Sequence, residues 1–139
     1  MLSMTNVKQV PREPDWVSVC FECSAIRIFR ELCEGIEADV EAINQIKDMG
    51  ITPFGANLTR DKSTIVVGQY NVTSPRPRVS IGVVDDRIVV RDEASQREWS
   101  ATVRVNNEGR CTLRLESGVE LEQWQFRMGA LQDLSFLRR

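Results

Sequence analysis

The stretch from Ser24 to Ile46 constrains the fold more than any other part of the sequence. Its apolar residues recur every three or four positions, at Phe29, Leu32, Cys33, Ile36, Val40 and Ile43. This spacing places them along one face of an α-helix, with charged residues on the other faces. Ser24 is suited to cap the start of the helix and Gly50 to end it. The stretch therefore predicts a long amphipathic helix against which the rest of the chain folds.

After this helix the apolar residues alternate with polar ones, which is typical of β-strands. We expect strands over 51–57, 63–71, 78–84, 87–91, 98–105 and 110–116. Proline and glycine inside the first of these segments make it a weak strand and place it at a sheet edge. Short turns rich in aspartate, asparagine and glycine separate the later segments. Consecutive strands joined in this way form an antiparallel meander with one buried face and one face in water.

Two segments leave alternatives open. Residues 16–22, WVSVCFE, are rich in β-branched and aromatic side chains and favour a short strand, although an earlier helix start capped by Asp15 competes with it. Near the C-terminus we expect a helix from about Leu121, whereas residues 119–122 could instead be extended. Helical register places five apolar residues of that stretch on one face, namely Leu121, Trp124, Met128, Leu131 and Leu134. Phe126, Ala130 and Leu137 broaden this apolar stripe.

Together these elements predict an α+β fold. It is a two-layer sandwich in which an N-terminal amphipathic helix and a C-terminal helix cover one face of an antiparallel meander of five to six strands. Residues 15–139 are expected to form a single domain, because a chain of this length can bury one core. The polar residues 1–14 are expected to form a flexible N-terminal tail.

The composition excludes several kinds of chemistry. The chain has no histidine, which rules out Ser-His-Asp and Cys-His catalysis and histidine-containing zinc sites within it. No glycine-rich loop precedes a helix, so no phosphate-binding loop is visible. We therefore expect no enzyme, and no catalytic, cofactor-binding or metal-binding residues. The net charge of −2 also argues against a general nucleic-acid binder.

The absence of long apolar runs bears on location. No run of about 18 apolar residues is present, so we expect no membrane span. The first residues lack the apolar segment of a secretory signal, so we expect a cytoplasmic protein with four reduced cysteines. Cys20 and Cys23 form a CxxC, which can be a redox pair or half of a zinc site. Because Cys33 and Cys111 lie on inward faces, we expect cysteines that pack as small apolar side chains.

Arginines gather on the outer face of the expected sheet, at Arg78, Arg87, Arg91, Arg104 and Arg114. Guanidinium groups on one face can bind an acidic protein or a nucleic-acid backbone. Glu98 and Glu116 share this face, however, and no aromatic residue alternates with the arginines for base stacking. A plain solvated face is the alternative interpretation.

These observations lead to two functional hypotheses. The first is a small non-catalytic protein-interaction module, of adaptor, chaperone-like or immunity type, that binds another protein or a second copy of itself. The second is a carrier of a small apolar ligand. With a strand at 16–22, the order of elements resembles the helix-grip folds, which wrap a curved sheet around a C-terminal helix and leave an apolar pocket. That resemblance implies that Trp99, Trp124 and Met128 line the pocket.

Overall fold

The computed structural model describes residues 15–46, 54–69, 78–93, 95–132 and 134. Within these residues the helices are α2 (Trp16–Glu22), α3 (Ala25–Ile46) and α4 (Gln123–Leu131). The strands are β1 (Phe54–Leu58), β2 (Thr64–Gln69), β3 (Val79–Val84), β4 (Arg87–Asp92), β5 (Arg97–Val105), β6 (Cys111–Leu115) and β7 (Glu120–Leu121). Gly50, the expected helix end, lies outside the described residues.

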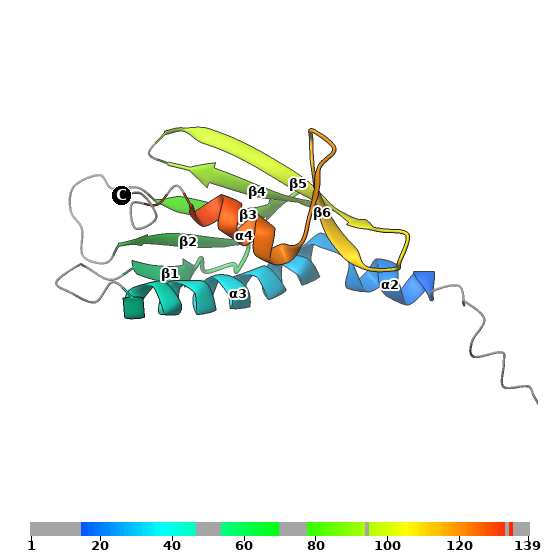
Figure 1. Cartoon of the computed structure of the whole chain (residues 1–139), viewed down its shortest axis with the longest axis horizontal. Helices are drawn as coiled ribbons and strands as arrows, with labels where there is room; N and C mark the ends of the chain where they lie inside the picture. The colour runs from blue at the N-terminus through cyan, green and yellow to red at the C-terminus, as the bar shows by residue number, and fades with distance from the viewer. Residues whose placement is uncertain (1–14, 47–53, 70–77, 94, 133, 135–139) are drawn as a thin grey trace, which may run out of the picture.

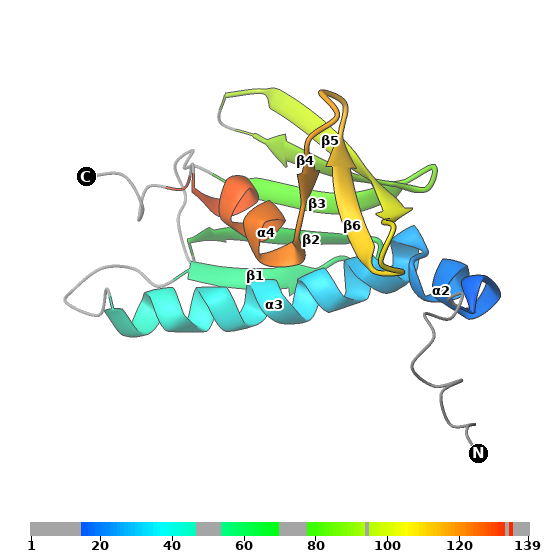
Figure 2. The ribbon, with the colours of Figure 1, turned by 45° about the vertical axis from the view of Figure 1, so that its right-hand side comes forward.

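The seven strands form one antiparallel sheet in which every strand pairs with its neighbours in the sequence, in the order β1 to β7. Helices α3 and α4 pack against one face of this sheet and against each other (Figures 1 and 2). The predicted α+β two-layer fold is therefore confirmed. The meander has seven strands instead of five or six, because the extended alternative for residues 119–122 is correct and supplies β7.

The core lies between the sheet and the two helices. The sheet contributes alternate residues of its inner strands, namely Ile65, Val67, Val79, Ile81, Ile88, Val90, Ala101 and Leu113. Helix α3 contributes the expected stripe, including Phe29, Leu32, Ile36 and Val40. The alternate residues of the strands and the apolar stripe of α3 pack together in a single cluster. The core therefore consists of the residues that the sequence pattern predicts to be buried.

Residues 16–22 form the helix α2, so the predicted strand is wrong. Asp15 caps this helix, since its carboxylate accepts hydrogen bonds from the Ser18 hydroxyl at 2.9 Å and the Ser18 N–H at 3.5 Å. The segment lies beyond the end of the sheet (Figures 1 and 2), where a strand would find no neighbour for its backbone. Helix α3 then starts afresh, with the Ser24 hydroxyl accepting from the Arg27 N–H at 3.4 Å. The element order expected of a helix-grip fold thus loses its first strand.

Helix α4 buries only part of the stripe predicted for it. Trp124 and Met128 are each 53% exposed, whereas the buried residues are Phe126, Ala130 and Leu131. The prediction placed Leu121 inside the helix, but Leu121 belongs to β7 and the helix begins at Gln123. The sheet contacts the face of α4 that carries Phe126, whose ring centroid lies 5.0 Å from that of Trp99.

Gly35 has a packing role in the middle of α3. Arg127 of α4 lies across this glycine and donates to Asp39 with an Nε–Oδ2 distance of 2.7 Å. A Cβ atom at Gly35 would meet the Arg127 guanidinium at 2.6 Å. A glycine within a helix costs about 1 kcal/mol relative to alanine. Here the missing side chain makes room for an interhelical ion pair whose two side chains are half-buried.

This arrangement predicts a coupling between the two positions. In the Arg127→Ala background, Gly35→Ala should raise the free energy of unfolding by about 1 kcal/mol, because only helix propensity changes. In the wild-type background the same substitution displaces Arg127, so we expect no gain or a small loss. Urea unfolding of the four proteins measures the difference as a double-mutant cycle. Equal effects in both backgrounds would show that Arg127 does not rest on Gly35.

Candidate binding cleft

An open cleft of about 760 Å³ lies beside the first half of β5. It is bordered by the start of β5, by the first residue of β4, by the end of β6 with the turn and strand β7 that follow, and by the second half of α4. The residues that matter most for its chemistry are Arg87, Glu98, Trp99, Leu121 and Gly129. The cleft is therefore a gap at the edge of one strand, between the sheet and the end of the last helix.

The cleft exists because β5 is longer than its neighbour β6. Pairing between them ends at Ala101 and Leu115, where the chain leaves the sheet and reverses at Gly118. Gly118 has a φ of +96°, in the left-handed region that favours glycine. The chain then returns as β7 on the far side of β6. Residues 97–100 consequently pair with β4 on one side and face the cleft on the other.

The floor of the cleft is apolar. The ring of Trp99 forms part of it and is supported from below by Phe126 at an interplanar angle of 57°. Leu115 and Leu121 are partly buried beside it. A Cβ atom at Gly129 would lie 3.7 Å from the Trp99 ring, so a larger side chain there would enter the cleft. The glycine thus keeps the space above the tryptophan open.

The rim carries charges of both signs. Arg91 and Glu98 form an ion pair at 2.8 Å on the outer side of the strand. Arg87 is held more loosely, with a 3.4 Å hydrogen bond to the Ser100 hydroxyl and a distance of 4.0 Å to Glu116. Exposed ion pairs contribute about 0–1 kcal/mol, so the Arg87 guanidinium can turn toward an acidic ligand at little cost.

The structure places the five predicted arginines on or next to the outer side of β3 to β6. Arg78 lies 3.8 Å from Glu93, and Arg87 and Arg91 are paired as described above. Within the described residues, Arg104 and Arg114 form no ion pair. The strand register sets Arg114 across Thr102 from Arg87, and all three line a groove of about 200 Å³ next to the cleft. Whether this face binds a partner stays a prediction.

The three residues expected to line one ligand pocket are not brought together. Trp99 borders the cleft, whereas Trp124 and Met128 line a separate groove of about 370 Å³ between α3 and α4. The Trp124 indole N–H donates to Glu122 at 3.1 Å, and its ring is left half exposed. A single apolar pocket built from these three side chains is therefore not what the fold creates.

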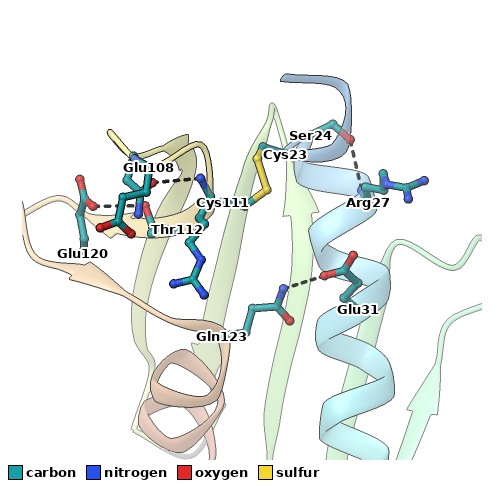
Figure 3. The surroundings of a disulfide bond; sticks show 11 residues. Cys23, Ser24, Arg27, Glu31, Glu108, Cys111, Thr112, Glu120 and Gln123 are labelled. Carbon is teal, nitrogen blue, oxygen red and sulfur yellow. Dashed lines mark hydrogen bonds between the residues drawn. A yellow bond between two sulfur atoms is a disulfide. The ribbon is translucent and has the colours of Figure 1, made fainter. Parts of the chain in front are cut away.

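The prediction of four reduced cysteines is wrong, because Cys23 and Cys111 form a disulfide (Figure 3). Their Cα atoms are 5.3 Å apart and 88 positions separate them in the sequence. The bond ties the junction between α2 and α3 to the start of β6, and the Gln123 to Glu31 hydrogen bond of 2.7 Å lies below it in the same view. Spacing could not reveal this pair, since only the fold brings the two ends together.

The disulfide also separates the CxxC motif into two different environments. Cys23 is bonded to Cys111, and Cys20 is a free, exposed thiol on α2, which corrects the expectation that it packs as an apolar side chain. Cys33 is buried on α3 as predicted. Burial raises the pKa of the Cys33 thiol to about 11, with Glu37 and Glu34 adding to the effect. At neutral pH Cys33 is thus a thiol with little nucleophilic character.

Sequence reasoning named Trp99 but missed the strand edge beside it. The predicted ranges for β5 and β6, 98–105 and 110–116, differ little in length, so no unpaired segment was visible. The available signal was the turn at Ser117 and Gly118, which follows directly after the last alternating residue. The role of Gly129 depends on where α4 packs and has no signature in the local sequence.

Comparison with family models, with curated proteins and with solved structures gave no match. Functional inference therefore rests on the geometry of this chain. Within the described residues, no three side chains of cysteine, aspartate or glutamate cluster as a metal site. No described helix has both the length and the apolar character needed to cross a membrane.

Proposed function

We propose that this protein is a non-catalytic protein-interaction module and that the β5 cleft is its binding site. One observation carries the proposal: a strand edge that no described residue covers borders an apolar floor in a cleft of about 760 Å³. Binding clefts of this size and composition are common in proteins, and sheet edges are a recurrent place for partners to attach. The partner is another protein, in agreement with the first of the two hypotheses from the sequence.

The charged groups around the cleft support a binding role over a catalytic one. The carboxylate of Glu98 is engaged by Arg91, and Glu116 is the acid nearest to Arg87. Ion pairs of this kind neutralise each other and offer no poised base. Cys20, the exposed free cysteine, lies on α2 and does not line the cleft. These features suit a surface that recognises a partner by shape and polarity.

The proposal can be tested by selecting ligands and then filling the cleft. A displayed library of random dodecapeptides is selected against the oxidised wild-type protein. Leucine in place of Gly129 projects into the cleft above Trp99, so binding of selected peptides should weaken at least tenfold. Met128→Leu, the matched control on the adjacent exposed position, should bind as the wild type does. Titration calorimetry measures both, and equal affinities of the two variants would place the binding site elsewhere.

The carrier hypothesis retains one supporting observation, the apolar Trp99 floor with Arg87 at the rim. A carrier would take up a small amphipathic acid, and native mass spectrometry of the purified protein would show an added mass of organic size. The same spectrum reports the oligomeric state and therefore tests the predicted homodimer.

A cytoplasmic location stays part of the proposal, although the disulfide removes one of its grounds, since such bonds are favoured in oxidising compartments. Counting free thiols on protein trapped with an alkylating agent inside cells tests it. Four free thiols would agree with a reducing cytoplasm, whereas two would point to an oxidising compartment.

A further inference from the structure

We infer that the cleft binds an extended segment of a partner protein as an additional strand of the sheet. This inference rests on the proposed function and specifies how the partner is held. It begins from the backbone of β5, because a strand with one free side presents N–H and C=O groups that another chain can satisfy. Strand addition of this kind gives affinity through the backbone and specificity through alternate side chains.

The pairing pattern identifies which backbone groups face the cleft. Asn106, just after β5, donates its N–H to the Arg110 carbonyl at 2.9 Å, so its backbone groups point toward β6. Hydrogen-bonding direction alternates along an antiparallel strand, and the register shows no bulge along β5. The backbone groups of Ser100 and Glu98 therefore point to the same side as those of Asn106. On that side, no backbone partner of Glu98 is present within the described residues.

The shape of the cleft favours a single strand over the sheet edge of a second copy. Within the described residues, the edge that β6 leaves uncovered spans only residues 98–100, because β6 occupies the same side of β5 from Ala101 onward. The turn after β6 and the end of α4 also line the cleft, through Ser117 and Gly129. A short recess with two walls can admit one extended segment, whereas pairing of two folded sheets needs an edge that protrudes.

The two faces of the added strand would meet different surroundings. Side chains that point inward would lie over Trp99 and Leu121, which suits medium-sized apolar residues. Side chains that point outward would lie beside Glu98 and Ser100 of β5, with Arg87 and Glu116 also lining the cleft. The expected ligand is thus an extended peptide in which apolar side chains alternate with polar ones.

The test compares two variants that lack the same side chain, of which only one also lacks the backbone N–H. Glu98→Pro deletes an N–H that β4 does not use, while Glu98→Ala loses the same carboxylate and keeps the N–H. Dodecapeptides selected on the wild type should bind Glu98→Pro at least tenfold more weakly than they bind Glu98→Ala, since the two variants lack the same carboxylate and differ in the N–H. In the wild type, hydrogen exchange at the Glu98 amide should slow at least tenfold on peptide addition. This second measurement decides the matter if Glu98→Pro does not fold.

The outcomes separate the inference from the proposed function. If Glu98→Pro and Glu98→Ala bind alike and the Glu98 amide is unprotected, while Gly129→Leu loses binding, the cleft binds its partner without strand addition and the inference is overturned. If no peptide is selected, or Gly129→Leu binds normally, both fail. Protection of the Glu98 amide that depends on protein concentration alone would identify a second copy as the occupant and would also overturn the inference.

Discussion

Replacing Cys111 with alanine should lower the free energy of unfolding by about 2–5 kcal/mol, because the disulfide restricts the unfolded chain over a long loop. The loop between Cys23 and Cys111 contains all of α3 and the strands β1 to β5. For a domain of this size, a loss of about 3 kcal/mol corresponds to a fall in melting temperature of about 12 °C. Thermal unfolding of the variant and of the reduced wild type measures this, and the two should nearly agree.

Cys20→Ala is the matched control for the disulfide. It removes an exposed thiol three positions from Cys23 and leaves the bond in place, so its melting temperature should be close to that of the wild type. A thiol count of two in the unfolded, unreduced wild type would agree with one disulfide. If reductant left the melting temperature unchanged, the bond would have no part in stability.

Phe126→Ala should destabilise the protein by about 3–5 kcal/mol, the usual cost of deleting a buried aromatic ring. Phe126 is fully buried, and its ring supports Trp99 from inside the core. The cavity left behind would also let the Trp99 ring drop from the cleft floor. We therefore expect peptide binding to weaken under conditions in which the variant is still folded.

A second substitution on the same helix isolates the effect of burial. Trp124→Ala deletes a larger ring, but that ring is half exposed and lies outside the cleft. Its cost should be about 1 kcal/mol or less, as for most surface positions. Urea unfolding compares the two variants directly. Similar losses would mean that Trp124 is as well packed as Phe126, contrary to the burial in the structure.

The fold class could be predicted from periodicity because, in α3 and in the central strands, the apolar positions in the sequence are the buried positions in the structure. Leu32 on the helix and Val79 or Ile88 on the strands are buried where alternation or helical spacing places them. The turn at Asp85 and Asp86 was equally plain, and both residues adopt the positive φ that tight hairpins need. Helices, strands and turns that depend mainly on nearby residues in the sequence can therefore be predicted from the sequence.

The errors arose where distant segments decide the outcome. Residues 16–22 have strand-forming side chains, yet no sheet edge reaches them, so local hydrogen bonds and the Asp15 cap prevail. Trp124 fits a helical stripe but lies on the exposed face, because the sheet contacts Phe126 instead. For the site, Trp99 could be named in advance, whereas the free edge at Glu98 depends on where β6 ends.

The meander has a consequence for the order in which the chain assembles. Each strand pairs with the next one along the chain, so hairpins from β1 to β7 can close over short loops, which is kinetically favourable. Cys23 and Cys111 are 88 positions apart, so closing their loop costs more entropy than closing a hairpin of the meander. We therefore expect oxidation to be a late step that locks a sheet already formed.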